Sequence, residues 1–217
     1  MRSAIVMGKG ELAIRIGKWF LNEKGYSLDA IVPVIPEPAW APSFKNWGEG
    51  HGLKIIESGL YQDIPKVMEK DWKVDLVFSV FYDKIIEEWF IKKCVKILNI
   101  HNSPLPKYRG VSPINWALKN NESEHGVTIH EIIPQIDAGS IAAQLKYSIY
   151  PEFDEVIDVY KRAIEYGWVL FQQTMPILDN IKMRPQDESQ MTYYNEKQNS
   201  LLGERRGFAK EKSIPKK

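Results

Sequence analysis

The stretch NIHNSPLPKYRG, residues 99–110, places a carboxamide and an imidazole two positions apart. In an extended chain Asn99 and His101 point to the same side, while Ile100 points into the core. Asn99 supplies N–H donors that stay in place at physiological pH, and His101 supplies an imidazole ring with two nitrogens. The prolines that follow restrict the turn. The pattern therefore predicts two polar groups held toward one ligand.

The elements that would position this pair alternate along the chain. Short apolar runs predict strands at residues 3–7, 28–35, 53–57, 75–80, 94–100, 126–132 and 141–149. Helical spacing or intervening length predicts helices after residue 10, near 42–51, 62–70, 84–92 and 113–120, and from Asp154 onward. Such alternation is typical of an α/β fold, Rossmann-like and doubly wound, with a mostly parallel sheet and helices on both faces. We expect a catalytic domain over residues 1–180 and a C-terminal appendage over 181–217, with a possible hairpin and a basic tail.

The composition of the chain limits the kinds of partner that it can bind. The 217 residues carry 29 Lys and Arg against 28 Asp and Glu, so no basic field favours nucleic acid. No run resembles a membrane span or a signal peptide, which predicts a cytoplasmic protein without a membrane partner. The single cysteine, Cys94, excludes an intramolecular disulfide and a multi-cysteine metal site, and no metal is expected.

In open α/β sheets ligands bind beyond the carboxyl ends of the strands, which selects the loops at residues 8–10, 81–86 and 99–113. Gly8, Lys9 and Gly10 offer backbone N–H groups at a helix start, where either a structural turn or a phosphate site fits. The other histidines, His51, His125 and His130, are interpreted as structural.

The third loop carries a resemblance to a known family. NIHNSPLPKYRG resembles the Asn-x-His…Ser-x-Leu-Pro motif of the folate-dependent formyltransferases. QIDAGSIAAQ resembles that family's Asp-x-Gly-x-Ile segment, and DLVFSVFYDKII resembles its folate-loop strand. The resemblance spans roughly residues 3–180 and implies a catalytic set of Asn99, His101 and Asp137. It also implies 10-formyltetrahydrofolate as donor and a primary amine as acceptor.

The chemistry of that transfer suits these residue types. An amine that attacks a formamide carbon creates a negative oxygen, which preorganised donors such as Asn99 and a protonated His101 stabilise. Asp137 beside the imidazole can accept or relay the proton that the attacking nitrogen loses.

The resemblance also implies the folate contacts, which in the family come largely from main chain. The matching positions are Phe81, Tyr82, Asp83, Ile85, Ile133, Pro134, Gln135 and Ile136. Asp83-Lys84 stands where several relatives have Gly-Arg or Arg-Ile, and ordinary packing is the alternative role for Phe81 and Tyr82.

The acceptor is narrowed by YRGVSPINWALKNNESEHGVTIH, which resembles the Arg-Gly-x-x-Pro form of sugar-nucleotide and initiator-tRNA formyltransferases. This form disfavours glycinamide ribonucleotide, and the lack of a large basic C-terminal domain disfavours methionyl-tRNA, although both remain alternatives. The expected substrate is a nucleotide-linked amino-deoxysugar, such as dTDP-4-amino-4,6-dideoxyglucose, for surface glycans that include O-antigen lipopolysaccharide. The candidate contacts are Gly8, Lys9, Gly10, Trp40, Trp47, Ser103, Arg109, Gly110, Tyr193 and Tyr194.

Two other classes stay open: a nucleotide-binding module without catalysis, and a dehydrogenase. Ala13 stands where the dinucleotide fingerprint needs its third glycine, which disfavours the dehydrogenase. Apolar residues in MTYY and LLGERRGF predict a hairpin or a patch through which two copies form a homodimer.

Overall fold

The computed structural model of the chain describes residues 1–68 and 72–203. The chain forms two compact units. The first comprises Met1–Ile100 together with Glu131–Pro134, and the second comprises His101–His130 together with the chain from Gln135 onward.

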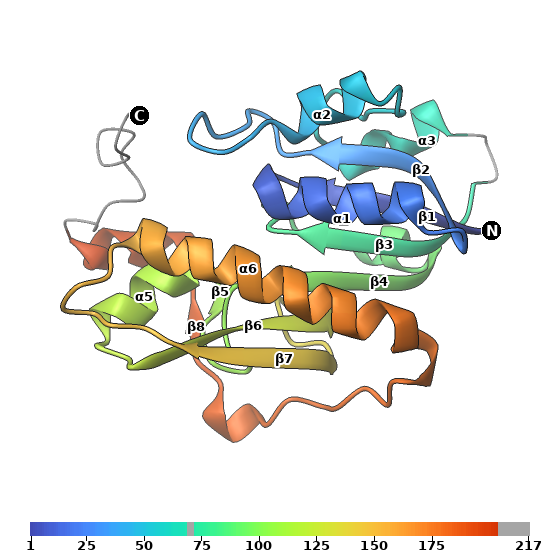
Figure 1. Ribbon diagram of the computed structural model, residues 1–217. Coiled ribbons are helices and arrows are strands. Elements are labelled where there is room, and N and C mark those ends of the chain that lie inside the picture. The colour runs from blue at the N-terminus through green and yellow to red at the C-terminus, as the bar shows by residue number, and fades with distance from the viewer. Residues whose placement is uncertain (69–71, 204–217) are drawn as a thin grey trace. The chain divides into compact units, whose positions relative to one another are not determined.

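Four parallel strands build the sheet of the first unit (Figure 1). They are β1 (Arg2–Gly8), β2 (Tyr26–Pro33), β3 (Val74–Val80) and β4 (Cys94–His101), in the spatial order β2-β1-β3-β4. Gly8 lies level with Val80 of β3 and with Pro33 of β2, and Ser79 lies level with Asn99 of β4. The carboxyl ends of these strands therefore meet at one edge, where a doubly wound fold binds its ligands.

Helices cover both faces of this sheet. They are α1 (Gly10–Asn22), α2 (Phe44–Gly50), η1 (Tyr61–Asp63), α3 (Ile64–Val67) and α4 (Glu88–Ile91). Ile5 and Met7 of β1 belong to a buried cluster with Tyr61, Ile64 and Phe90 from the later elements. The neighbouring β1 residues, Ala4 and Val6, are equally buried but face the other way, where α1 packs on β1 and β2.

The second unit contains an antiparallel pair and a long helix (Figure 1). Its elements are β5 (Arg109–Gly110), α5 (Pro113–Lys119), β6 (Glu124–Glu131), β7 (Ile141–Ser148), α6 (Val156–Thr174), η2 (Met175–Asn180), η3 (Glu188–Gln190), β8 (Tyr193–Tyr194) and η4 (Glu196–Leu202). Helix α6 packs on β7 and α5, and it begins at a capping box formed by Glu155 and Asp158. Strands β5 and β8 pair in parallel although the paired residues lie far apart in sequence.

The predicted fold class is confirmed, because the described strands are mostly parallel and helices flank them. The strand predicted over 53–57 is wrong: only an isolated bridge joins Ile55 to Ile31. Gly52 and Gly59 have left-handed backbones at both ends of this segment, so the chain turns away before a ladder can extend. The helices predicted near 62–70 and 84–92 are single turns at 64–67 and 88–91, and residues 69–71 lie outside the described part.

The division at residue 180 and the hairpin in the tail stay predictions. Within residues 181–203, β8 pairs with β5 of the expected catalytic domain rather than with a strand of the tail itself. The expected basic tail, over 204–217, lies outside the described residues.

Candidate active site

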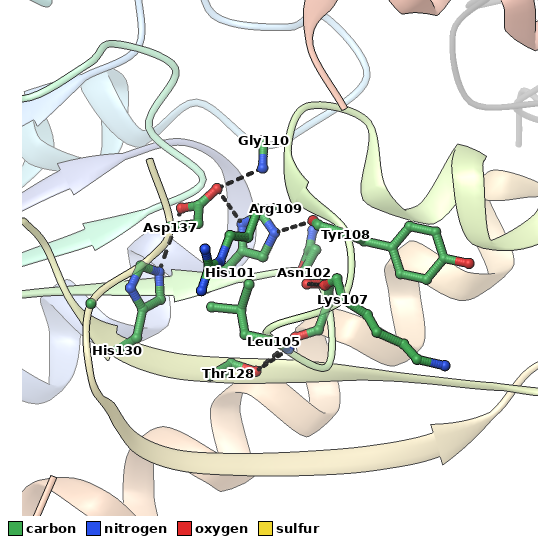
Figure 2. Close-up of polar contacts among 12 residues, drawn as sticks. His101, Asn102, Leu105, Lys107, Tyr108, Arg109, Gly110, Thr128, His130 and Asp137 are labelled. Carbon is green, nitrogen blue, oxygen red and sulfur yellow. Dashed lines mark hydrogen bonds and ion pairs between the residues drawn. The ribbon is translucent and has the colours of Figure 1, made fainter. Parts of the chain in front are cut away.

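His101 ends β4 and is held from both sides of its ring (Figure 2). Its Nε2 lies 2.8 Å from the carbonyl oxygen of Tyr108, and its Nδ1 lies 3.6 Å from Oδ2 of Asp137. A carbonyl oxygen can only accept, so Nε2 carries a proton and donates it to Tyr108. The edge of the ring that is left for proton transfer is therefore Nδ1, the edge that faces the carboxylate.

Asp137 lies between two imidazoles and a backbone amide (Figure 2). Its Oδ2 accepts a hydrogen bond from the Gly110 N–H at 2.8 Å, and its Oδ1 lies 3.5 Å from Nε2 of His130. Asp137 has a φ of +50°, a backbone conformation that non-glycine residues seldom adopt. Such strain is typical of functional sites, where surrounding contacts hold a side chain in one orientation.

His130 is a site residue that the sequence interpretation missed. It is 1% exposed, and its ring meets the ring of His101 edge to face at 6.3 Å between centroids. The pairing of β6 with β7 shifts register between Ile129 and His130, and such irregularities often re-aim a side chain near a site. A histidine at a strand's carboxyl end was the available signal, but its carboxylate partner lies on a separate loop.

Asn99 lies two residues before His101 on the same strand, with fully buried Ile100 between them. Because side chains alternate along a strand, Asn99 and His101 leave the same face of β4. Asn99 is half-buried, so it stays accessible from that face. The sequence thus brings a neutral donor and an imidazole onto one strand face, and the structure adds the carboxylate that orients the imidazole.

The sequence pattern of the formyl transferase family matches residues 60–175, more than half of this chain. The chain belongs to that family. This formyltransferase is also similar to solved structures of sugar N-formyltransferases. It shares 26% identity and a TM-score of 0.76 with an N-formyltransferase from Helicobacter canadensis, over 91% of this chain and 72% of that one.

That relative was solved with folinic acid and dTDP-3-aminofucose. A second relative is WlaRD, a sugar 3N-formyltransferase solved with dTDP and 5-N-formyl-tetrahydrofolate. It is 25% identical, with a TM-score of 0.75 over 91% of this chain and 70% of that one. A 4-N formyltransferase from Francisella tularensis shares the fold at 19% identity, with a TM-score of 0.71 over 90% and 77% of the two chains.

The turn after His101 in this formyltransferase is fixed by internal hydrogen bonds. Ser103 is fully buried, and its hydroxyl donates to the Lys107 carbonyl at 2.7 Å. The Ser103 carbonyl accepts from the Thr128 hydroxyl at 2.7 Å. In this structure Ser103 therefore supports the turn, and its predicted role as a substrate contact stays a prediction.

The residues predicted to bind folate lie on two loops. Phe81 has a φ of +55°, which places an irregular backbone directly after β3. Tyr82 is half-buried, and its hydroxyl donates to the Gly59 carbonyl at 2.6 Å. Asp83 pairs with Lys84 at 3.3 Å. Phe81 and Tyr82 thus shape the loop, and the hydroxyl of Tyr82 is hydrogen-bonded to another residue of the first unit.

The apolar members of the predicted folate set are open to solvent. Ile85 is 67% exposed, Ile133 36% and Ile136 40%, and Pro134 and Gln135 complete an exposed loop. Exposed isoleucines beside irregular backbone are what a flat heterocycle needs for apolar walls and edge-on hydrogen bonds. Each loop by itself therefore offers apolar side chains and irregular backbone of the kind that a pterin binds, and the folate contacts stay predictions.

The glycine loop between β1 and α1 is sterically constrained. A Cβ on Gly8, whose φ is +149°, would meet the Val80 carbonyl oxygen at 2.1 Å. Lys9 precedes α1, and burial lowers the pKa of its ammonium group, opposed in part by the charge of Asp83. The loop has a structural reason for its first glycine, and Lys9 at a helix start suits an anionic group.

The remaining residues predicted to contact the substrate differ in how many contacts they make within the chain itself. Arg109 is 5% exposed, and its guanidinium donates to Gln186 and Glu188. Tyr194 stacks between Tyr108 and Trp116. By contrast, Tyr193 is 42% exposed and Trp40 is half-buried. Tyr193 is thus the better placed tyrosine to stack on a base, and the contacts proposed for all four stay predictions.

A cavity of about 350 Å³ in the second unit is not lined by Asp137. It adjoins the turn at Pro104–Tyr108 and the segment at Arg184–Asp187.

Over residues 1–68 and 72–203, no group of three or more histidine, cysteine or acidic side chains is placed to hold a metal ion. None of the helices in that part of the chain has the length and apolar character that a bilayer crossing requires.

Proposed function

We propose that this formyltransferase moves the formyl group of 10-formyltetrahydrofolate to the amino group of a nucleotide-linked amino-deoxysugar. The observation that carries the proposal is the Asp137 carboxylate at the open ring nitrogen of His101, on the strand that also presents Asn99. Two relatives of 25% identity or more, each solved with a folate compound and with dTDP or a dTDP-sugar, support the donor and the acceptor class.

The residues act on the amine and on the developing oxygen. Attack of the amine nitrogen on the formyl carbon forms a new C–N bond and leaves a negative charge on the formyl oxygen. The Asn99 carboxamide and the Nδ1–H of protonated His101 are the donors for that oxygen. The attacking nitrogen gives its proton to the carboxylate of Asp137, directly or through a water molecule. Cleavage of the carbon bond to the folate nitrogen completes the transfer, and that nitrogen takes up the proton that Asp137 accepted, which restores the carboxylate.

The geometry favours catalysis over binding alone. Asp137 is held by Gly110, His101 and His130 in a strained backbone conformation, which a nucleotide-binding module would not need. The sugar-nucleotide assignment is supported by Lys9 at a helix start and by exposed Tyr193. A dTDP-linked sugar destined for O-antigen or another surface glycan is the form of acceptor we propose. The cytoplasmic location and the homodimer stay predictions, and sedimentation of the full chain tests the dimer.

The test is an assay of the purified chain with 10-formyltetrahydrofolate and a panel of acceptors. The panel contains dTDP-linked 3-amino and 4-amino deoxysugars, a UDP-linked amino sugar, glycinamide ribonucleotide and methionyl-tRNA. Mass spectrometry detects the addition of one formyl group, and we expect it on one of the amino sugars only. Transfer to glycinamide ribonucleotide or to methionyl-tRNA would show that the proposed acceptor class is wrong. Transfer to none of them, with the Asp137→Asn variant binding nucleotides as the native chain does, would favour the non-catalytic module.

A further inference from the structure

Residues 184–194, here called the clamp segment, hold the loop that carries the catalytic contacts. Backbone bonds join Arg184 to Ile141 in both directions, at 2.7 and 2.9 Å. Thr192 receives two N–H groups: that of Arg109 on its carbonyl, at 2.9 Å, and that of Tyr108 on its hydroxyl, at 2.7 Å. The clamp segment is thus bonded to both the β7 side and the β5 side of the site.

The same loop residues contact the catalytic pair. The Tyr108 carbonyl accepts from His101, and the Gly110 N–H donates to Asp137. Gly110 has a φ of +90°, and a Cβ there would meet the Tyr194 carbonyl at 2.1 Å. The close pairing of β5 with β8 therefore fixes where the two groups that hold His101 and Asp137 lie.

Gln186 connects this pairing to Asp137 directly. Its Nε2 donates to the Asp137 carbonyl at 2.7 Å and to the Gly139 carbonyl at 2.8 Å. Its Oε1 accepts from Nε and Nη2 of Arg109, at 3.0 and 2.8 Å. The reversed amide would set an oxygen against two carbonyls and an NH2 group against a guanidinium, so the network defines its orientation.

Arg109 is fixed in turn by a carboxylate. Its Nη1 and Nη2 donate to the two oxygens of Glu188 at 3.0 and 2.6 Å, a bidentate pair that lowers the pKa of Glu188. The guanidinium is buried, while Glu188 is exposed. The Oε1 of Gln186 is therefore held by the buried guanidinium of Arg109, and its Nε2 donates to the strained turn at Asp137.

We propose that Gln186 is a positioning residue of the transfer reaction, which acts through Asp137. It holds the left-handed turn at residue 137, so that one carboxylate oxygen stays on the Gly110 N–H and faces Nδ1 of His101. Without its two N–H groups the turn relaxes and the carboxylate moves away from the imidazole. This inference rests on the proposed function for its kinetic test, but not for its structural test.

The kinetic test compares Gln186→Ala and Gln186→Glu with Gln190→Ala. Gln190 lies on the same segment, but its side chain donates to Asp187 instead. Because a displaced catalytic group costs turnover rather than binding, we expect kcat to fall about tenfold or more in both Gln186 variants. We expect the KM for the folate donor and the KM for the sugar acceptor each to change less than about twofold in these variants. Gln190→Ala should behave as the native chain does. Gln186→Glu keeps an acceptor for Arg109 but loses both donors to the turn. If it retained native kcat, Gln186 would serve Arg109 alone and the proposal would fail.

A double-mutant cycle that combines Gln186→Ala with Asp137→Asn tests whether Gln186 positions Asp137 or has only a general structural role. If Gln186 acts through Asp137, Gln186→Ala causes no further loss of kcat in the Asp137→Asn background. An equal loss in both backgrounds would overturn the proposal.

The second readout does not need activity. Amide hydrogen exchange at Gly110, measured by NMR, should be faster in Gln186→Ala than in Gln190→Ala, because the acceptor at Asp137 is displaced. Equal exchange in the two variants would refute the inference even if the native chain formylated an amino sugar. Faster exchange in a chain that formylates nothing would support it while the proposed function failed.

Discussion

A buried histidine outside the catalytic contacts makes stability depend on pH. His125 is fully buried on β6, and its Nε2 donates to the Asn102 carbonyl at 2.8 Å. Its Nδ1 has no hydrogen-bond partner among the described residues. Burial lowers the pKa of His125 to about 4, against the opposing effect of the hydrogen bond to Asn102. The native state therefore keeps this ring neutral well below the pH at which a free imidazole is half protonated.

The direction of the effect follows from proton binding. In the unfolded chain the ring titrates near a pKa of about 6.5, so between about pH 6.5 and 4 the unfolded state binds more protons. Stability is then lost as pH falls through that range. For pKa values of about 4 and 6.5, the contribution lost between pH 7 and pH 5 is about 2 kcal/mol, and the full loss is about 3 kcal/mol.

The measurement is urea unfolding, followed by tryptophan fluorescence, of the native chain and of His125→Gln at pH 7, 6 and 5. Glutamine can retain a donor toward Asn102 but does not titrate. We expect the free energy of unfolding of the native chain to fall by about 2 kcal/mol more than that of the variant between pH 7 and 5. Parallel losses in the two proteins would refute the reasoning, because His125 would then titrate alike in both states.

Three further predictions concern the site and its scaffold. Asn99→Ala should lower kcat on the order of a hundredfold with little change in KM, because one oxyanion donor is lost; near-native turnover in a formylation assay would contradict that role. Gly8→Ala should lower the free energy of unfolding by about 2 kcal/mol or more, because its Cβ would collide with Val80, whereas Gly25→Ala has open space and serves as the control in the same urea titration. Lys9→Ala should weaken sugar-nucleotide binding roughly tenfold in calorimetry, and native binding should depend only modestly on salt; a fall of several powers of ten would indicate a polyanionic acceptor.

The sequence predicted most of the sheet, and the placement of Asn99 and His101 on one strand face, for physical reasons that act locally. Strands β1, β3 and β4 are largely apolar runs, and a pleated strand sends Asn99 and His101 to one side whatever the tertiary fold. The segment at 53–57 has the same apolar character but contributes only a bridge, because the flanking glycines decide how long it stays beside β2.

The rest of the site depends on contacts that no local pattern encodes. Strands β5 and β8 are two residues each, too short for any periodicity, and they pair Arg109 with Tyr193 and Gly110 with Tyr194. Gln186 lies in a polar stretch that reads as a loop, and its contacts with Asp137 and Arg109 arise only in the folded chain. The substrate contact of Arg109 stays a prediction, and the structure pairs its guanidinium with Glu188, a partner that sequence spacing cannot reveal.

The pairing of β5 with β8 also sets the order in which this protein becomes competent during synthesis. A ribosome that has released the chain only as far as α6 has already delivered His101, Asp137 and the whole parallel sheet. Thr192, which accepts the N–H groups of Tyr108 and Arg109 on its hydroxyl and its carbonyl, is still in the exit tunnel or not yet made. Nascent chains would therefore present His101 and Asp137 before residues 192–194 anchor the loop that carries Tyr108 and Gly110.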